Sequence, residues 1–292
     1  MRIGYTQTLV CEQVENGRAL LVDSAGARVP LTETLDPPAV GTRIDVFVYA
    51  GPDGGPMATR RHPYVQCGGC ASLKVVATGP GGVFLDWGLE KHLLLPFAEQ
   101  RRPLEVGQME SVLVYLDNSG RLAATSRLDH HLEEHPKGFD AWQSVDLLVY
   151  QRTELGYKAV ADERAIGLIY ASDVFQPVRP GLRVRGWVKR VREDGRLDLA
   201  LQPPAREMTD SLAERVIAWL VENDGVGTLT DRSSPEDIKA RFQVSKKNYK
   251  RALSSLYKQR RIRLEADRVV LVQDTLDDDD AAVGEVDLSG KH

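Results

Sequence analysis

Three stretches of this sequence alternate apolar and polar residues, and a glycine lies near the start of each. They are Val40–Tyr49, Val106–Tyr115 and Pro180–Lys189. Successive side chains of a strand point to opposite faces, so this alternation predicts strands with one face on a core and one in water. The stretches recur after about 65 to 75 residues, which is too long for a solenoid repeat and suits small β-barrels in series.

Each repeat contains five short apolar segments bounded by Gly, Asn or Asp, and these segments predict five strands. In the first repeat, residues 1–64, we expect them at Thr8–Val10, Ala19–Asp23, Ala27–Leu31, Arg43–Ala50 and Met57–Arg61. In the second, residues 65–128, we expect them at Leu73–Thr78, Gly82–Trp87, His92–Pro96, Glu110–Leu116 and Leu122–Ser126. In the third, residues 144–203, we expect them at Val145–Glu154, Gly156–Asp162, Ile166–Tyr170, Leu182–Glu193 and Leu197–Leu201. Five strands with a helical or irregular connection between the third and the fourth describe an OB-type barrel.

Residues 129–143, between the second and third repeats, are polar and predict a linker with one or two helical turns. After Pro203-Pro204 the apolar period becomes helical. Ser211 and Glu214 have the spacing of a capping box, which predicts a first helix beginning there. A second helix is expected after Ser234, and a third from Lys246 to about Arg260.

Two short apolar segments, Ile262–Glu265 and Val269–Val272, then predict a hairpin. Three helices followed by a hairpin is the order of a winged helix, which we place at residues 205–273. The predicted fold class is therefore mainly β with a C-terminal α+β domain: three tandem OB-fold barrels followed by a winged helix. The acidic residues 274–292 predict a disordered tail.

Charge is distributed unevenly along the chain. The net charge is −4, yet residues 205–272 carry 14 basic and 10 acidic residues, and residues 273–292 carry 1 and 7. From Arg241 to Arg263 there are nine basic residues and no acidic one. Lys246, Lys247, Lys250 and Arg251 fall on one face of the third predicted helix. Such a cluster indicates a polyanion partner, because phosphates are held by several cations at once. A solvated helix face is the alternative.

Other motifs carry little chemistry. Cys67 and Cys70 have the spacing of half a zinc site, but no second pair follows and a tetrahedral site needs four ligands. His131 and His135 are four residues apart without the order of a metalloprotease motif. The sequence has no glycine-rich phosphate loop with a lysine, no nucleophile elbow and no cluster of carboxylates. We therefore expect neither an enzyme nor a cofactor or metal.

Three stretches resemble a known family. Gly82–Gly88 followed by Leu93–Pro96 is similar to strands two and three of the S1 class of OB fold. Gly186–Leu199, and Asp231–Ile238 running on to Ser245–Lys250, are similar to the bacterial conserved virulence factor B family of RNA-binding proteins. The resemblance extends from the N-terminus to about Val272. It implies three S1-type barrels, a C-terminal winged helix, and an RNA-binding protein without catalysis that affects gene expression.

On the S1 template, rings on strands two and three stack on bases while basic side chains hold phosphates. The resemblance places Phe84 at a ring position of the second barrel. It indicates that the usual strand-three histidine is replaced by Leu95 in the second barrel and by Tyr170 in the third. The third barrel is the better candidate, since it offers Tyr157, Lys158 and Tyr170, and its fourth strand adds Arg183, Arg185, Lys189, Arg190 and Arg192. For each ring, packing within the protein is the alternative.

Three classes of function remain open. A single-stranded RNA-binding protein is favoured. A DNA-binding regulator would use the winged helix in a major groove, where only Asn248 offers an amide on the third helix. A protein-interaction module would dock on the ribosome or RNA polymerase. No apolar run approaches 18 residues, so we expect a cytoplasmic protein and no membrane partner, and nothing indicates more than a monomer. The acidic tail is a hypothetical competitor for the basic patch.

Overall fold

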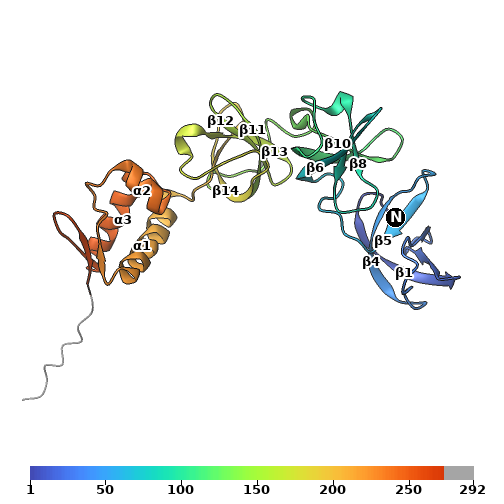
Figure 1. The fold of residues 1–292 in the computed structure, drawn as a ribbon, viewed down its shortest axis with the longest axis horizontal. Coiled ribbons are helices and arrows are strands. Elements are labelled where there is room, and N and C mark those ends of the chain that lie inside the picture. Colours follow the sequence, from blue (N-terminus) through green and yellow to red (C-terminus); the bar gives the residue numbers. More distant parts are fainter. Residues whose placement is uncertain (273–292) are drawn as a thin grey trace, which may run out of the picture. The chain divides into compact units, whose positions relative to one another are not determined.

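The computed structural model describes residues 1–272, apart from the side chains of residues 205–208. The chain divides into two compact units, residues 1–204 and the unit that begins at Ala205. The first unit contains three five-stranded sheets, and the second contains three helices and a small sheet (Figure 1). The tail, residues 274–292, for which disorder is predicted, lies outside the described residues.

The first sheet is a nearly closed barrel. Its strand order is β3-β2-β1-β4-β5, and a bridge between Leu31 and Ala58 brings the two edge strands together. A tight turn at Asn16 and Gly17, with φ of 50° and 77°, joins the first two strands. The strands are β1 (Thr6–Glu15), β2 (Arg18–Val22), β3 (Arg28–Pro30), β4 (Arg43–Ala50) and β5 (Pro56–Thr59).

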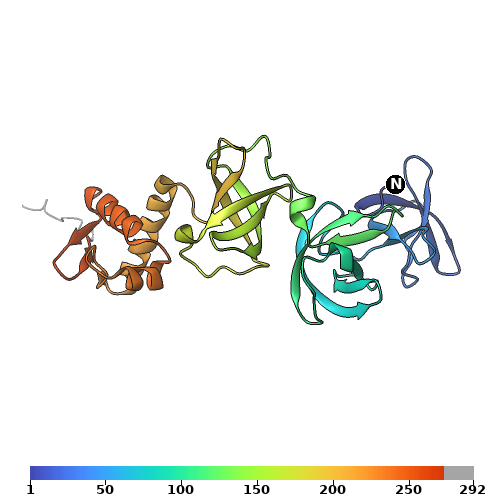
Figure 2. The ribbon, with the colours of Figure 1, turned by 90° about the horizontal axis from the view of Figure 1, so that it is seen from above.

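The second and third sheets are closed barrels with one topology (Figure 2). In both, the third strand pairs with the second in antiparallel and with the fifth in parallel orientation. The second barrel contains β6 (Cys70–Gly79), β7 (Gly82–Asp86), β8 (Leu93–Pro96), the 3-10 turn η1 (Phe97–Glu99), β9 (Met109–Leu116) and β10 (Leu122–Thr125). The third contains β11 (Ser144–Arg152), β12 (Gly156–Ala161), β13 (Ala165–Tyr170), the 3-10 turn η3 (Ala171–Asp173), β14 (Arg183–Val191) and β15 (Leu197–Ala200).

Strand alternation explains where the apolar side chains go. On β11, Leu147 and Val149 are buried in the core of the third barrel. Leu148 and Tyr150 point the other way and are also buried, in a separate cluster that includes Leu113 of the second barrel. Strands that bury both faces read as continuous apolar runs, which is why this segment alternates poorly in the sequence.

A glycine begins the second strand of both closed barrels because the backbone of the third strand lies against it. A Cβ on Gly82 would lie 2.2 Å from the carbonyl oxygen of Leu95, and one on Gly156 would lie 2.0 Å from that of Ile169. Any side chain at these two positions would force the strands apart. The glycines thus fix the pairing of the two strands that carry the outer face considered below.

Residues 129–143, which the sequence predicts as a polar linker, are packed against the third barrel. A 3-10 turn, η2 (Leu128–His130), begins the segment, and the carbonyl of Glu133 accepts a hydrogen bond from the backbone N–H of Ile166. The ring of Phe139 is buried in the core of the third barrel. One aromatic residue among many polar ones is enough to anchor this short segment against the barrel.

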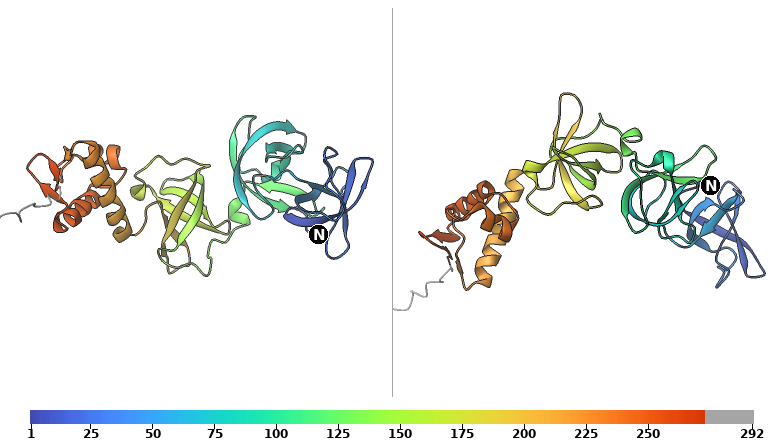
Figure 3. Two further views of the ribbon diagram at one scale, coloured as in Figure 1. Left: turned by 90° about the horizontal axis from the view of Figure 1, so that it is seen from below. Right: turned by 45° about the horizontal axis from the view of Figure 1, so that its top comes forward.

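The second unit is a winged helix (Figure 3). Its sheet has the order β16-β18-β17, and its core includes Trp219, Phe242 and Tyr249. The Phe242 ring stacks on Tyr249 and meets the edge of Trp219, with centroids 5.1 and 5.5 Å away. The elements are α1 (Ala205–Glu222), β16 (Val226–Gly227), α2 (Pro235–Phe242), α3 (Lys246–Lys258), β17 (Ile262–Leu264) and β18 (Val269–Leu271).

The starts of α2 and α3 follow the predicted signals, and the start of α1 does not. Ser234 caps α2 by accepting from the N–H of Asp237, and Ser245 caps α3 by accepting from that of Asn248. Helix α1 begins at Ala205, so Ser211 lies inside it and forms no capping box. The helix begins directly after Pro204, and proline is common near helix starts. The Ser-x-x-Glu pattern is a weaker signal, because it also occurs inside helices. No described helix is long and apolar enough to cross a membrane.

Candidate nucleic-acid interface

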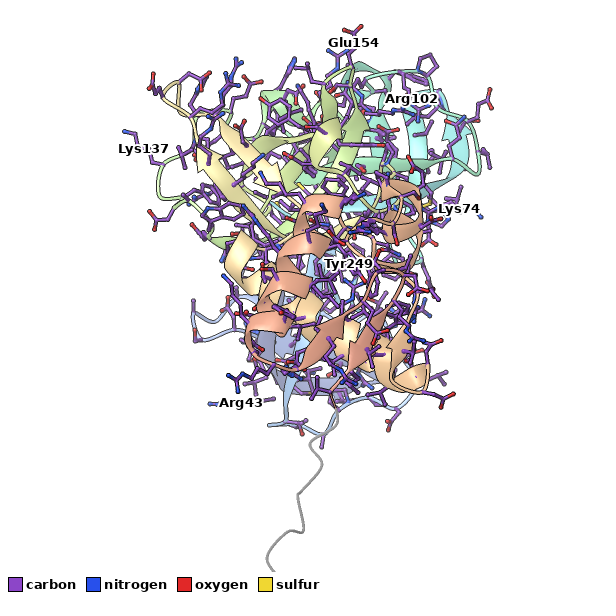
Figure 4. The ribbon with its side chains drawn as sticks, turned by 90° about the vertical axis from the view of Figure 1, so that its left-hand side faces the viewer. Arg43, Lys74, Arg102, Lys137, Glu154 and Tyr249 are labelled. Carbon is purple, nitrogen blue, oxygen red and sulfur yellow. The ribbon has the colours of Figure 1, made fainter. Side chains whose placement is uncertain are left out.

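A cleft of about 500 Å³ opens on the outer face of the third barrel. Strands β12, β13 and β15 contribute to it, together with the turn at residues 153–155 and the turn at residues 192–196. Figure 4 labels Glu154, which marks the first of these turns. In OB barrels the face of strands two and three, with the loops between strands one and two and between four and five, is where oligonucleotides bind. The cleft occupies that face and is bounded by those two loops.

Strand register places four side chains in one row across this face. Lys158 on β12 lies opposite Leu168 on β13, and Leu168 lies opposite Asp198 on β15. Asp198 in turn lies opposite Arg190 on β14. Ile169, the sequence neighbour of Leu168, is buried in the barrel core, so the row itself faces outward. The arrangement combines an apolar centre with charged groups on both sides.

Tyr170 is the aromatic residue of the cleft. It lies at the end of β13, two residues beyond Leu168 and therefore on the same face, and it is half-buried. Its partner on β12 is Gly156, which presents no side chain. A ring held by the barrel on one side and bordering an open cleft on the other is a surface on which a base can stack.

The predicted cations of β14, and Arg192 directly after its end, are paired with acidic groups. The sequence suggested a strand of available positive charge, but every one of these residues has a carboxylate within 4 Å. The shortest N···O distances are 2.5 Å for Arg183–Glu163, 3.8 Å for Arg185–Asp146, 2.7 Å for Lys189–Asp173, 2.6 Å for Arg190–Asp198 and 3.6 Å for Arg192–Asp194. The Asp198 carboxylate is buried, but the other four pairs are at the surface and are worth about 0–1 kcal/mol each, so they reduce the local field and still allow exchange for a phosphate.

The structure brings only some of these residues to the cleft. Arg192 lines it with Lys158 and Tyr170, and Arg190 reaches it through Asp198. Arg183 lies elsewhere, since its guanidinium donates to the carbonyl of Cys70 in the second barrel. Arg185 and Lys189 on the same strand do not line the cleft.

Lys158 is held in place by its neighbours. Its Nζ lies 3.0 Å from Asp129 Oδ2, and the Tyr150 hydroxyl donates to the other oxygen of Asp129. Burial opposes ionisation of Asp129, but the hydrogen bonds from Tyr150 and Lys158 outweigh it and lower the pKa of that carboxyl. Burial, and then the same carboxylate, raise the pKa of the Tyr150 phenol. The lysine therefore presents its charge from a fixed position.

Tyr157 does not lie on the outer face. It pairs with Ile169 and packs against the core of the third barrel, so its ring is turned inward at the barrel end. Because the outward residue beside it is Lys158, the face has a lysine where the S1 template led us to expect a ring. Packing within the protein, the alternative considered from the sequence, describes Tyr157.

In the second barrel the structure also changes the assignment of Leu95. Leu95 is fully buried in the core, and the outward residue of that strand is Leu94, which lies opposite Phe84. Three consecutive leucines give no alternation from which the faces could be told apart. Pairing with the glycines makes Pro96, and not Leu95, the counterpart of Tyr170. Phe84 is half-buried, with its ring against Gly79.

Helix α3 exposes a row of cations. Its buried side is formed by Tyr249 (Figure 4), Ala252, Leu253 and Leu256. Burial raises the pKa of the Tyr249 phenol, whose hydroxyl donates to the carbonyl of Leu229.

On the opposite side Lys247, Arg251 and Lys258 are exposed and form no ion pair with any described residue. Lys246 and Lys250 lie to one side, where Lys246 donates to the carbonyl of Arg232 and Lys250 lies 3.7 Å from Asp231. The predicted face is thus split into a free row and a tethered pair.

Most of the residues that line the cleft were not among the predicted site residues, and three of them bear on the proposed site. Arg196 and Leu155 lie in the two turns, and Asp198 lies on β15. The Asp194-Gly195 turn before β15 was a usable signal, because it marks the loop between the fourth and fifth strands. Nothing in the sequence pattern indicated Asp198, since an acid within a strand usually faces water.

Comparisons with known proteins agree with this architecture. Residues 67–127 match the S1 domain family, and residues 214–271 match the CvfB-like winged helix domain family. The chain is 27% identical to "Conserved virulence factor B" of Staphylococcus epidermidis over 244 residues, which are 80% of this chain and 81% of that protein. It is 30% identical to "Uncharacterized protein YitL" of Bacillus subtilis over 228 residues, 74% of this chain and 75% of that protein. The chain belongs to the conserved virulence factor B family.

Among solved structures, this family member resembles a multidomain protein with nucleic acid binding domains from Streptococcus pneumoniae. The identity is 22%, the TM-score is 0.41, and the match covers 92% of this chain and 98% of that one. The family assignment confirms the predicted resemblance and the predicted fold class of S1-type barrels followed by a winged helix. Both matched domains are of classes that bind nucleic acids, and neither is an enzyme family.

The two cysteines with zinc-like spacing are in different environments. Cys70 is buried at the start of β6, while Cys67 is half-buried. Burial raises the pKa of the Cys70 thiol to about 12. Within residues 1–272, no three His, Cys, Asp or Glu side chains are grouped so that they could hold a metal ion.

Proposed function

We propose that this member of the conserved virulence factor B family binds single-stranded RNA, and that it acts in bacterial gene expression without catalysing a reaction. The third barrel would contact bases through its cleft, and helix α3 would contact phosphates. Candidate contacts are Tyr170, Lys158, Arg190 and Arg192 in the barrel and Lys246, Lys247, Lys250 and Arg251 on the helix.

One observation carries this proposal: the third barrel has its cleft on the face where OB folds bind oligonucleotides. That cleft contains an aromatic ring, an apolar floor and cations at its edge. The cleft suits single strands better than a duplex, because its ring can stack on a base only when that base is unpaired. Sequence-specific recognition of RNA generally uses unpaired bases in this way.

The second barrel contributes less to the proposed site. Phe84 and Leu94 give its outer face an apolar surface, but neither has a cation opposite it. We therefore propose that Phe84 makes a secondary, apolar contact with the RNA. The remaining β14 cations, Arg183, Arg185 and Lys189, are assigned to the flank of the third barrel and not to its cleft.

The free row on α3 favours one alternative, a DNA-binding regulator. The third helix of a winged helix is the one that enters a major groove, and its exposed face here is basic. That row has no amide side chain for reading adenine, although its arginine and lysines could contact either guanine edges or phosphates. Single-stranded RNA is preferred as the main ligand because the cleft of the third barrel offers a ring for unpaired bases.

Fluorescence anisotropy with the full chain tests the proposal. Labelled single-stranded RNA, single-stranded DNA and duplex DNA of equal length are titrated at two salt concentrations. We expect the tightest binding for single-stranded RNA and weaker binding at higher salt. Preference for the duplex would support the DNA-binding alternative. Absence of binding to all three would favour a module that docks on the ribosome or RNA polymerase.

A further inference from the structure

The carboxylate of Asp198 has one oxygen engaged and one without a partner. Arg190 donates to Oδ2 twice, from Nη2 at 2.6 Å and from Nε at 3.1 Å. Oδ1 is buried and accepts no hydrogen bond from any part of the chain that the structure describes. Buried polar atoms in folded proteins are almost always paired, so an unpaired one needs an explanation.

The position of Asp198 suggests what that explanation is. The residue is only 3% exposed, yet it lines the cleft of the third barrel. Its neighbour across the sheet is Leu168, and Tyr170 lies further along the same strand. A flat base resting on this apolar floor and against the ring would direct its edge toward the carboxylate. The sugar and phosphate would stay at the rim, beside Arg192 and Arg196.

We propose that Asp198 reads the edge of a base in this cleft and selects bases that carry an amino group. The inference rests on the proposed function, because it assumes that the cleft holds single-stranded RNA. A carboxylate oxygen can only accept hydrogen bonds. Cytosine N4 and adenine N6 are amino groups that can donate to a carboxylate, whereas uracil has a carbonyl oxygen where cytosine has N4. Carboxylates are known to accept hydrogen bonds from cytosine N4. Uracil has its one edge donor between two carbonyl oxygens, which repel a carboxylate.

Arg190 provides access to the unpaired oxygen. Its side chain is 65% exposed and makes its ion pair with the buried Asp198 of β15, so the guanidinium can shift without unpacking the apolar core of the barrel. In the proposed complex the guanidinium would turn from Oδ2 toward a phosphate, which would open space beside the carboxylate for the edge of the base. A fixed acceptor at the floor and a movable cation above it suit a site that distinguishes one base edge from another.

The test compares hexacytidylate with hexauridylate, two pyrimidine oligomers that stack weakly and differ at the edge in question. Anisotropy with the full chain should show binding about tenfold tighter for the cytidine oligomer, as expected for one charge-assisted hydrogen bond. In Asp198→Asn the amide oxygen can still accept from Arg190 and the amide nitrogen replaces Oδ1. A donor at that position should remove the preference for cytidine or reverse it.

Asp173→Asn is the matched control. It removes one negative charge from the third barrel at the Lys189 pair, outside the cleft, and should leave the cytidine-to-uridine ratio unchanged. Equal wild-type affinity for both oligomers would overturn the inference and leave the proposed function intact, and this comparison needs no variant. Failure of both oligomers to bind would overturn the inference and the proposed function together. Loss of ribo-oligomer binding in Asp198→Asn that is equal for both bases and absent for DNA would place the carboxylate on the 2′-hydroxyl and also overturn it.

Discussion

The row of free cations on α3 should set most of the salt dependence of RNA binding. Lys247, Arg251 and Lys258 are exposed and have no ion-pair partner among residues 1–272. The cations of β14, by contrast, already have carboxylates beside them, so a phosphate must displace an acid to reach them. Unpaired cations can bind phosphates and release condensed counterions from RNA without first breaking an ion pair within the protein. We therefore consider the triple substitution of the α3 row by alanine.

The expected magnitude follows from the number of cations removed. Each phosphate neutralised on a single strand contributes about 0.7 to the slope of log K against log salt, so three cations contribute about 2. Between 50 and 200 mM salt, wild-type affinity should fall about twentyfold further than that of the triple variant. The helix should persist, because the three positions face solvent and alanine is the strongest helix former.

Anisotropy titrations at four salt concentrations measure this slope. The matched control removes Arg18, Arg43 and Arg121, three exposed cations of the first two barrels that have no ion pair among the described residues (Arg43 is labelled in Figure 4). We expect the control slope to equal that of wild type. Equal reductions of slope in the two triple variants would refute the distinction between the α3 row and other surface cations. An unchanged slope in the α3 variant would refute the assignment of phosphates to this helix.

Three further predictions concern separate features. Tyr170→Ala should weaken RNA binding by about 1–3 kcal/mol through lost stacking, measured by anisotropy, whereas the same change at the exposed Tyr64 should have no effect. Deleting residues 274–292 should raise RNA affinity at low salt if the acidic segment competes for the basic helix, and unchanged affinity would rule out this competition. Alkylation of the native protein at pH 8, followed by mass spectrometry, should modify Cys67 and spare Cys70, with all thiols modified in denaturant. The folded pKa of Cys70 lies above its ordinary value of 9.0, so its contribution to stability is complete below pH 9 and is lost as the pH rises toward 12.

The barrels could be predicted from the sequence because their information is local. Alternation along β4 and turns such as Asn16-Gly17 are set by neighbouring residues, and a period of two has one structural meaning. Prediction was poorer where the local pattern was uniform or ambiguous. The three leucines of β8 conceal which one faces inward, and a Ser-x-x-Glu pattern in α1 resembles a helix start although it lies inside the helix.

The electrostatics of the site could not be predicted, because the partners are far apart in the chain. Lys158 contacts Asp129, which is 29 residues away, and Arg183 contacts Glu163, which is 20 residues away. A count of charges along β14 gave an excess of cations that the folded barrel neutralises. The same limitation hid Asp198, whose burial results from the parallel pairing of β15 with β13 and not from its own neighbours in sequence.

The two units therefore differ in the kind of interaction they can supply. The third barrel is close to charge balance at its cleft, so long-range attraction there is weak, and selectivity has to come from contacts at short range: the Tyr170 ring, the Leu168 floor and the Asp198 carboxylate. The helix α3 has free charge and an exposed ring, Tyr257, and both phosphate contact and stacking tolerate any base, so the helix can supply affinity that is insensitive to base identity. Substitution of Asp198 by asparagine should consequently change the ratio of affinities between bases at constant salt slope, and substitutions on α3 should change the slope at constant ratio. The ratio of affinities and the salt slope are measured independently. A variant at either site that altered both quantities would therefore show that base selectivity and phosphate binding are not separated between the cleft and the helix.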